Sequence, residues 1–193
     1  MPADPPPHPQ EHPHGQPLVV LINGAPGSGK STLAHALAAD WPMALALDID
    51  QLKFSLGGWR DDLNAAGLQA RRLALALIAS QLSRGHSVVL GQYLARTPFI
   101  EELEQASAAG GARFCEFVLD VSPEVLRGRL ARRAERPDRP EQHHNNTLVG
   151  PGDAPTLVRS MHDLRHLRPQ AQVVDGNSDI ATTLTAIRER ITP

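Results

Sequence analysis

The chain has 193 residues, of which 41% are hydrophobic and 21% charged, so it is long enough for one domain with a sizeable core. Its 19 Lys and Arg residues nearly balance 21 Asp and Glu residues, which argues against nucleic acid or a membrane surface as its partner. The single cysteine, Cys115, excludes an intramolecular disulfide framework and a metal site made of cysteines alone. No apolar run approaches the roughly 18 residues that cross a bilayer, and the N-terminus lacks the features of a secretory signal. We therefore expect a cytoplasmic protein.

Residues 1–17 differ in composition from the rest of the chain. They contain seven of the 17 prolines and three of the nine histidines. Because no large apolar residue follows Met1, this segment cannot bury enough surface to offset the entropy of ordering it. We predict a disordered tail at 1–17, with a weak transition-metal site on its histidines as the alternative, and a domain at 18–193.

Apolar runs alternate with helical stretches from Leu18 onward. The apolar runs are predicted strands, at residues 18–23, 43–47, 87–90, 114–119 and 172–174. The predicted helices between and after them are residues 32–40, 63–84, 98–109, 123–136, 156–167 and 180–191. Strands that alternate with helices favour a parallel sheet covered on both faces, hence an α/β fold.

A glycine-rich motif directly follows the first predicted strand. Residues 24–31 read GAPGSGKS and match the pattern G-x-x-x-x-G-K-[ST] at every position. Its glycines let backbone N–H groups converge on a phosphate, and the helix that begins there adds the positive end of its dipole. Lys30 would contact the β- and γ-phosphates, and the Ser31 hydroxyl would ligate Mg²⁺. The predicted nucleoside triphosphate site comprises Gly24, Ala25, Pro26, Gly27, Ser28, Gly29, Lys30, Ser31 and Thr32.

Two carboxylates end the second predicted strand, in the stretch ALDIDQLK at residues 46–53. Asp48 and Asp50 are two residues apart, so an extended backbone would direct both side chains to the same side. They lie at the carboxyl edge of the predicted sheet, where α/β folds bind ligands. The alternative is that Asp50 only caps the next helix, because Asp is a good N-cap residue.

Arginines are concentrated at residues 126–136, which read LRGRLARRAER and open a segment without periodicity at 137–155. Arg129 and Arg133 are four residues apart and share one face of the predicted helix. Because 17 of the 19 cationic residues in the chain are arginine, a solvated helix face is the alternative to a binding site.

From Leu18 to the C-terminus, these motifs resemble those of the P-loop small-molecule kinases, a group with nucleotide, shikimate and gluconate kinases, chloramphenicol phosphotransferase and zeta-toxin kinases. VVDGN at residues 173–177 resembles the last strand and loop of these enzymes, beside the adenine. The resemblance implies a P-loop NTPase fold with three α/β/α layers, a five-stranded parallel sheet of order 2-3-1-4-5 and an Arg-rich lid at about 127–155. It also implies ATP and Mg²⁺ as cofactors.

The resemblance further implies a role for several residues. Asp50 would accept the proton of the acceptor hydroxyl and Asp48 would lie near Mg²⁺, although the two roles could be exchanged. Arginines of the lid would close over the nucleotide and neutralise charge on the γ-phosphoryl group. The implied catalytic residues are Asp50, Lys30, Arg129 and Arg133, and the implied metal ligands are Ser31 and Asp48.

The third predicted strand departs from the family pattern. Gly91 and Gln92 stand where many relatives have an Asp that supports Mg²⁺. Three interpretations are open: Asp48 and Asp50 take over this duty, water does, or catalysis is impaired.

The acceptor pocket would lie after the second and third predicted strands. Its candidate walls are aromatic, amide or charged residues: Phe54, Trp59, Arg60, Asp61, Gln92, Tyr93 and Arg96. We predict that Lys53, Arg60 and Tyr93 contact the acceptor, and Lys53 matches a basic position of the zeta toxins. Arg60 and Arg96 would suit an anionic acceptor, whereas Asp61 and Asp62 would suit a cationic or polyhydroxyl one.

The leading functional prediction is an enzyme, a kinase that moves the γ-phosphoryl of ATP to a hydroxyl of a small molecule. A polynucleotide 5′-kinase is the second hypothesis, although it needs a basic track with aromatic residues, and basic residues cluster only at 127–139. A nucleotide-binding switch or toxin-like module is the third, which the departure at Gly91 and Gln92 favours. His143 and His144 are predicted to be solvated rather than metal ligands.

Overall fold

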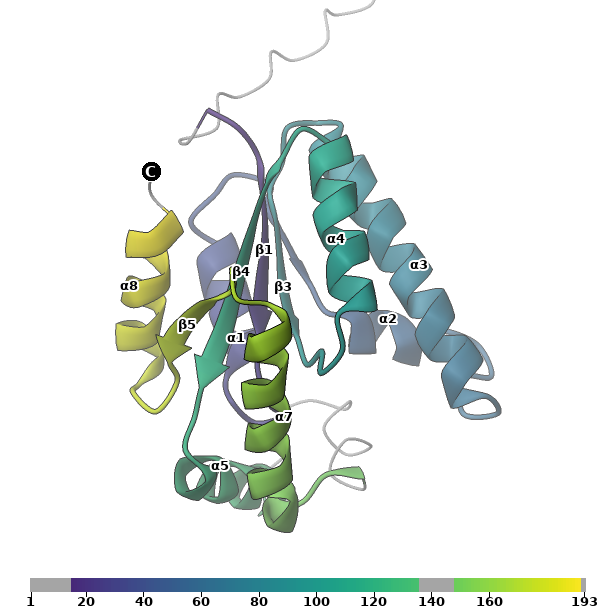
Figure 1. Ribbon diagram of the computed structural model, residues 1–193. Coiled ribbons are helices and arrows are strands. Elements are labelled where there is room, and N and C mark those ends of the chain that lie inside the picture. The colour runs from purple at the N-terminus through teal and green to yellow at the C-terminus, as the bar shows by residue number, and fades with distance from the viewer. Residues whose placement is uncertain (1–14, 136–147, 192–193) are drawn as a thin grey trace, which may run out of the picture.

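The computed structural model describes residues 15–135 and 148–191, and five strands lie at its centre (Figure 1). The strands are β1 (Leu18–Asn23), β2 (Leu45–Leu47), β3 (Val88–Gln92), β4 (Arg113–Asp120) and β5 (Gln172–Asp175). Their order across the sheet is β2-β3-β1-β4-β5, and every neighbouring pair is parallel. The predicted parallel sheet and its order are therefore confirmed. β2 begins two residues later than expected, because Met43 adopts a positive φ of 57° and turns the chain.

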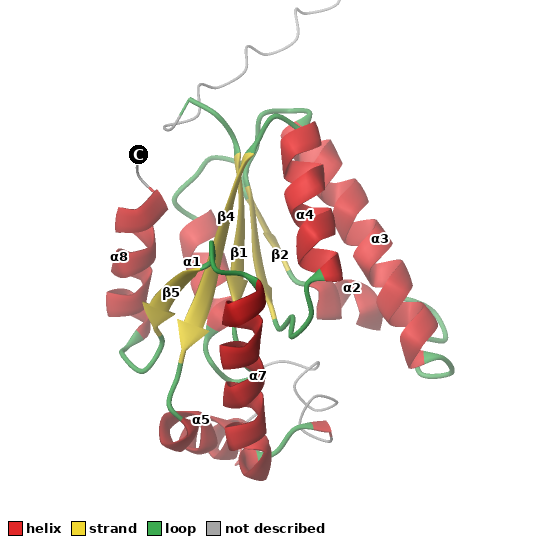
Figure 2. Cartoon of the chain, viewed as in Figure 1, coloured by secondary structure: helices red, strands yellow, loops and turns green. Residues whose placement is uncertain are grey.

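Helices cover both faces of this sheet (Figure 2). They are α1 (Lys30–Ala38), α2 (Ile49–Phe54), α3 (Leu63–Leu82), α4 (Pro98–Ala109), α5 (Pro123–Glu135), α7 (Ala154–Leu167) and α8 (Ile180–Ile191), with a 3₁₀ turn, η1 (Pro151–Asp153), before α7. α1 and α8 pack on one face, and α3, α4 and α7 on the other, which gives the predicted three layers. α2 is missing from the predicted helices because its six residues are too few for a helical pattern to repeat.

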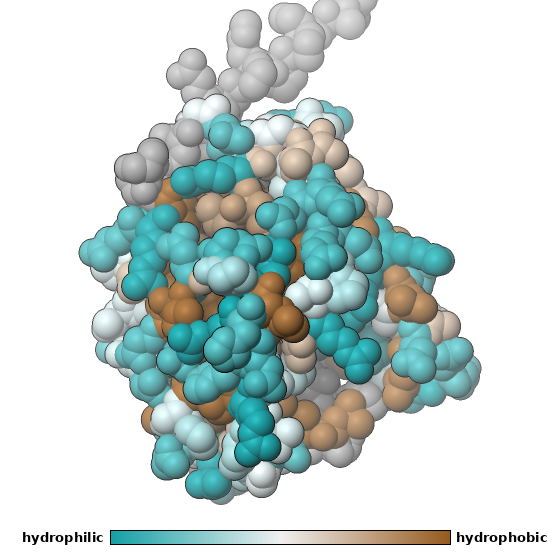
Figure 3. Space-filling view, viewed as in Figure 1, coloured by the Kyte–Doolittle hydropathy of each residue, from teal (hydrophilic) through white to brown (hydrophobic). Residues whose placement is uncertain are grey.

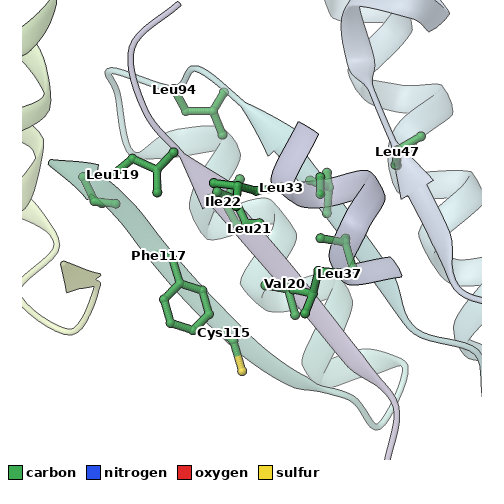
Figure 4. Packing of buried hydrophobic residues seen from close by; sticks show 14 of the residues in the cluster. Val20, Leu21, Ile22, Leu33, Leu37, Leu47, Leu94, Cys115, Phe117 and Leu119 are labelled. Atoms are coloured by element: carbon green, nitrogen blue, oxygen red, sulfur yellow. The ribbon is translucent and has the colours of Figure 1, made fainter. Parts of the chain in front are cut away.

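The core of the protein is built around β1, which lies between β3 and β4. All six residues of β1 are at most 1% exposed, because helices cover both of its faces. Leu33 and Leu37 of α1 lie beside the apolar side chains of β1 (Figure 4). Burial of each such leucine contributes on the order of 2 kcal/mol. This packing fixes the carboxyl end of β1, where the glycine-rich loop begins.

The last two residues of the predicted tail, Gln16 and Pro17, contact the amino end of the sheet. The Gln16 side-chain amide donates a hydrogen bond to the Gly111 carbonyl (3.1 Å), and the Pro17 carbonyl accepts one from the Arg113 N–H (3.0 Å). Residues 1–14 and 136–147 lie outside the described residues. They include most of the predicted tail and the middle of the predicted lid, with His143 and His144, so the extents 1–17, 18–193 and 127–155 stay predictions.

Polar side chains cover most of the face seen in Figure 3, and the apolar side chains exposed on that face lie in separate groups. Across the described part of the chain, the exposed large apolar residues are Met43, Leu63, Leu68, Leu77, Leu148 and Leu167. Within the same residues, no helix combines the length and the apolar composition needed to cross a membrane.

Candidate active site

The loop between β1 and α1 has a backbone that requires glycine. Gly27 and Gly29 have φ values of 85° and 99°, which L side chains rarely adopt. A Cβ atom on Gly24 would lie 2.7 Å from Ser28 Oγ, and one on Gly27 would lie 3.0 Å from Leu130 Cδ2. Ser28 Oγ is buried and has no hydrogen-bond partner within the described residues. A tight loop with an unpaired buried hydroxyl fits a phosphate ligand, as the motif predicts.

Lys30 is the centre of a group of charged side chains beside this loop. Burial lowers the pKa of its ammonium group to about 8, Asp50 and Asp48 oppose this shift, and Arg133 adds to it. The Lys30 Nζ atom also donates to the Ala25 carbonyl of the loop (3.4 Å). The fold therefore brings together three of the predicted catalytic residues and a predicted metal ligand from α1, the end of β2, α2 and α5.

Asp48 and Asp50 have different structural roles. Asp48 is the N-cap of α2, and its Oδ1 accepts the N–H groups of Asp50 (2.9 Å) and Gln51 (3.4 Å). Asp50 is the second residue of the helix, so the expectation that both carboxylates belong to one extended segment was wrong. The capping interpretation for Asp50 was also wrong, because Asp48 fills that position. Asp50 is left with a half-buried carboxylate that does not cap the helix.

Burial raises the pKa of Asp48, and the charge of Asp50 raises it further. The N–H groups of Gln51 and Asp50 and the charge of Lys30 oppose this shift. The surroundings of Asp48 therefore act on its pKa in both directions, with burial as the largest influence.

The two predicted metal ligands line one narrow pocket. Ser31 and Asp48 share it with His35 and Gly91, and the remaining walls are Ala34, Ala46 and Leu47. Among the described residues, no group of three or more His, Cys, Asp or Glu side chains is arranged so that it could hold a metal ion. One hydroxyl and one carboxylate suit Mg²⁺, which keeps several waters and binds phosphate oxygens when it accompanies a nucleotide.

The departure at Gly91 has a steric cause. A Cβ atom at this position would lie 2.7 Å from the Lys30 carbonyl oxygen and 2.9 Å from the Ser31 Cα atom. β3 therefore packs directly against the first turn of α1, and a carboxylate side chain at position 91 would displace that turn. Among the described residues, Asp48 is the carboxylate that lines the pocket with Ser31.

Asn23 is a site residue that the sequence reasoning missed. Its side chain is fully buried at the end of β1, and its Oδ1 accepts the N–H groups of Gly24 and Leu94, each at 2.9 Å. Its Nδ2 donates to the Leu94 carbonyl (2.9 Å). Asn23 thus ties the first residue of the glycine-rich loop to the segment after β3. The available signal was a single polar residue at the end of an apolar run.

The two predicted lid arginines differ in their partners. The Arg129 guanidinium donates to the carbonyls of Ser28 (3.1 Å), Gly176 (2.7 Å), Asn177 (3.2 Å) and Ser178 (3.2 Å). The charge of Arg133, in contrast, acts on Lys30, and burial lowers the pKa of Arg133 itself. Arg129 therefore binds backbone on the β4–β5 side of the loop.

Two of the predicted acceptor contacts come together around an aromatic pair. The rings of Phe54 and Trp59 meet edge to face, with centroids 4.7 Å apart. The Lys53 Nζ atom lies 5.4 Å and 6.0 Å from the centroids of these two rings, and the Arg60 Cζ atom lies 4.6 Å from that of Trp59. Such distances are typical of cation–π contacts. Lys53 is three residues after Asp50 on α2, so the two side chains share a helix face.

The third predicted acceptor contact lies apart from this pair. The Tyr93 hydroxyl is 3.0 Å from Ser160 Oγ, which joins the end of β3 to α7. Asp62, one of the carboxylates that would suit a cationic acceptor, caps α3 and accepts the N–H groups of Asn64 (3.0 Å) and Ala65 (2.9 Å).

Comparison with known proteins identifies the family of the chain and shows which proteins share its fold. A family model described as an AAA domain matches residues 19–149. The fold is similar to that of a gluconokinase from Sinorhizobium meliloti 1021, with a TM-score of 0.55 and 21% identity over 91% of this chain and 95% of that one. It is also similar to a tunicamycin resistance protein from Deinococcus radiodurans, with a TM-score of 0.59 and 14% identity over 92% and 99% of the two chains.

A third similar structure is the Pnkp1/Rnl/Hen1 RNA repair complex, with a TM-score of 0.61 and 17% identity. The match covers 78% of this chain but 46% of the matched chain. Proteins of different length and with different described functions therefore share this fold. The chain belongs to the AAA-domain family of P-loop proteins, and its fold is that of the P-loop small-molecule kinases.

Proposed function

We propose that this protein is a kinase that transfers the γ-phosphoryl group of ATP, in the presence of Mg²⁺, to a hydroxyl group of a small molecule. The observation that carries the proposal is the group of interacting charges formed by Lys30, Asp48, Asp50 and Arg133 beside the glycine-rich loop. The kinase-like P-loop fold supports nucleotide-dependent phosphoryl transfer in general.

The phosphates of the donor, ATP, would be held by backbone groups and by cations. Backbone N–H groups of the glycine-rich loop would bind the phosphates, and Lys30, whose ammonium is protonated below a pH of about 8, would neutralise their charge. Ser31 and Asp48 would hold Mg²⁺. When bound, the ion would supply neutralisation of the phosphate charge. Arg133 reaches the same group of charges from α5.

Asp50 would act as the general base. Because Asp48 caps α2, the Asp48 carboxylate already accepts two backbone N–H groups, whereas Asp50 has no such duty. Asp50 accepts the proton of the acceptor hydroxyl as that oxygen attacks the γ-phosphorus in line with the leaving ADP oxygen. Lys30 lies near enough to Asp50 for their charges to interact.

Lys53, Arg60 and Tyr93 would bind the acceptor. Trp59 holds the cations Lys53 and Arg60 beside the helix that carries Asp50, and the carboxylate of Asp62 is used as a helix cap. Of the two candidate carboxylates only Asp61 is then left, against the cations Lys53 and Arg60, so the charge available at this end is mainly positive. It favours an acceptor with a carboxylate or phosphate group in addition to its hydroxyl.

The test is release of ADP from ATP and Mg²⁺ with a panel of anionic, neutral and cationic hydroxyl compounds. We expect turnover that depends on an anionic acceptor, that is lost in Asp50→Asn, and that is kept in Asp163→Asn, which changes an exposed aspartate on α7. Near-normal turnover in Asp50→Asn would disprove the base assignment. Tight ATP binding without turnover on any acceptor would favour the nucleotide-binding switch instead.

A polynucleotide 5′-kinase is a second candidate. It is supported by the fold similarity to the RNA repair complex and by the cations stacked on Phe54 and Trp59, since ring and cation surfaces also bind nucleotides. An oligonucleotide with a 5′-hydroxyl group belongs in the same panel. Turnover on the oligonucleotide that falls steeply with salt, and no turnover on small acceptors, would decide for this candidate.

A further inference from the structure

Arg129 joins two segments that are far apart in the sequence. Its guanidinium donates to Ser28 of the glycine-rich loop and to three successive carbonyls between β5 and α8, those of Gly176, Asn177 and Ser178. A guanidinium carries five N–H donors in a rigid plane, so it can serve several carbonyls at once. One side chain on α5 therefore connects the phosphate loop to residues 176–178, which we call the β5–α8 loop.

The β5–α8 loop is also fixed from its other side. Asp175 Oδ1 accepts the backbone N–H (3.0 Å) and the side-chain amide (2.7 Å) of Asn177, and its Oδ2 accepts the Ser178 hydroxyl (2.7 Å). The hydrogen bonds from Ser178 and Asn177 hold the pKa of Asp175 at about 2. Because Asp175 uses these donors, the carbonyls of the loop are left to face Arg129.

The loop has little freedom to move toward the sheet. A Cβ atom on Gly176 would lie 2.7 Å from Val121 Cγ2, and the Gly176 N–H donates to the Asp120 carbonyl (2.8 Å). The Asn177 side-chain oxygen accepts the Ser122 N–H (2.8 Å). Arg129 thus holds a preformed loop against the phosphate loop, and it does not have to create the shape of that loop.

The strand order indicates which end of a bound nucleoside triphosphate would lie beside Arg129 and the β5–α8 loop. The γ-phosphoryl group must face Asp50, which follows β2 at one side of the sheet. The other end of the nucleotide then extends toward β4 and β5. On that side Ile180 Cδ1 would be 3.1 Å from a Cβ atom on Gly29, so the start of α8 borders the phosphate loop directly.

We propose that Arg129 is a positioning residue that holds the β5–α8 loop against the phosphate loop and thereby forms the wall that receives the nucleoside of the donor. This inference rests on the proposed function in that the donor is ATP. It differs from the role that the family resemblance implies, because Arg129 acts on backbone carbonyls and not on the transferred phosphoryl group.

The test compares ATP with inorganic tripolyphosphate, which has the phosphates and lacks the nucleoside. Dissociation constants are measured with Mg²⁺ and without acceptor for the wild-type protein, Arg129→Ala and Arg72→Ala, which removes an exposed arginine of α3. Loss of several charge-assisted hydrogen bonds predicts ATP binding weaker by about tenfold or more in Arg129→Ala. We expect tripolyphosphate binding to change less than about threefold, and Arg72→Ala to bind both ligands as the wild type does.

Two further variants guard against loss of folding. Arg129→Lys keeps the charge but serves fewer carbonyls, so its ATP affinity should be intermediate. Asp175→Asn loosens the β5–α8 loop without removing Arg129, and it should also weaken ATP more than tripolyphosphate. Thermal melting of each variant shows that it is folded.

Equal losses for ATP and tripolyphosphate would mean that Arg129 acts on the phosphates, and unchanged affinity for both would mean that it positions nothing. Either result overturns the inference. Because no acceptor is present, the outcome is separate from that of the proposed function, which fails when ATP binds but no phosphoryl group is transferred.

Discussion

The proposed donor end and the proposed acceptor end of the candidate site are built from different parts of the chain. The donor end is mainly backbone, with positive φ values at Gly27 and Gly29 and close packing against Leu130 and Ile180. The acceptor end is mainly side chains, with exposed Arg60 and half-buried Trp59 on a short segment after α2. A backbone site tolerates few substitutions, whereas a side-chain site can change its ligand with a few substitutions. We therefore expect changes at the two ends to have distinct consequences.

The largest effect is expected where the two ends meet, at Asp50. Asp50→Asn removes the proposed base and leaves the glycine-rich loop intact, so kcat should fall by about 10²–10⁴-fold. The dissociation constant for ATP, measured without acceptor, should stay within about threefold of the wild-type value. A large loss of ATP affinity with unchanged kcat would show that Asp50 belongs to the donor end. It would contradict the proposed division of the site into two ends.

A substitution at Gly91 tests whether the donor end depends on the close packing of β3 against α1. Gly91→Ala forces a methyl group against the Lys30 carbonyl, and it should lower the free energy of unfolding by about 2 kcal/mol and weaken ATP binding. Gly67→Ala is the matched control, because a Cβ atom on Gly67 meets nothing within 4 Å on α3. The control should stabilise the protein by about 0.5–1 kcal/mol in urea denaturation. Equal stability of both variants would contradict the close approach of β3 and α1.

The donor end should also respond to pH through Lys30. Its ammonium, with a pKa of about 8, loses its proton as the pH rises, so ATP affinity should fall by about tenfold between pH 7 and pH 9. Lys30→Arg keeps its charge in this range and should show a nearly flat profile, whatever its absolute affinity. Parallel profiles for the wild type and this variant would place the titrating group elsewhere.

Lys30 should also make the free energy of unfolding depend on pH, but in the opposite direction: this free energy should rise with pH, whereas ATP affinity falls. The pKa of Lys30 is lower in the folded protein than its ordinary value of 10.5, so between pH 8 and 10.5 the unfolded chain binds more protons. The contribution of Lys30 to the free energy of unfolding therefore rises with pH in this window. Lys30→Met should lose that contribution in denaturation curves recorded at pH 7 and pH 9.5.

The smallest effect is expected at the acceptor end. Trp59→Leu removes the ring that holds Lys53 and Arg60, so KM for an anionic acceptor should rise by about two- to fivefold. KM for ATP and for a neutral acceptor should not change. If KM for ATP rose instead, the segment after α2 would belong to the donor end, and the division between the two ends would be wrong.

The sequence predicted the parts of this site that depend on neighbouring residues. The P-loop could be found because its glycines, lysine and serine are consecutive and follow a strand composed almost entirely of apolar residues. The strand order came from the resemblance to a known family, and the structure confirms it. The same local reasoning failed at Asp48 and Asp50, because the chain turns from strand to helix between them and the spacing alone does not reveal the turn.

Other features could not be predicted because they join residues that are far apart in the chain. The bonds of Asn23 to Leu94 and of Arg129 to Ser28 span 71 and 101 residues. The reason for glycine at position 91 is also tertiary, since the atoms that exclude a side chain belong to Lys30 and Ser31.

The sequence by itself determined the α/β class and the phosphate loop, because periodicity and contiguous motifs are local properties. Only the tertiary structure decided which carboxylate caps a helix, why β3 carries no acidic side chain at position 91, and where the guanidinium of Arg129 binds. These depend on which backbone atoms come within a few ångströms of a side chain, and that is fixed by the packing of the sheet and its helices.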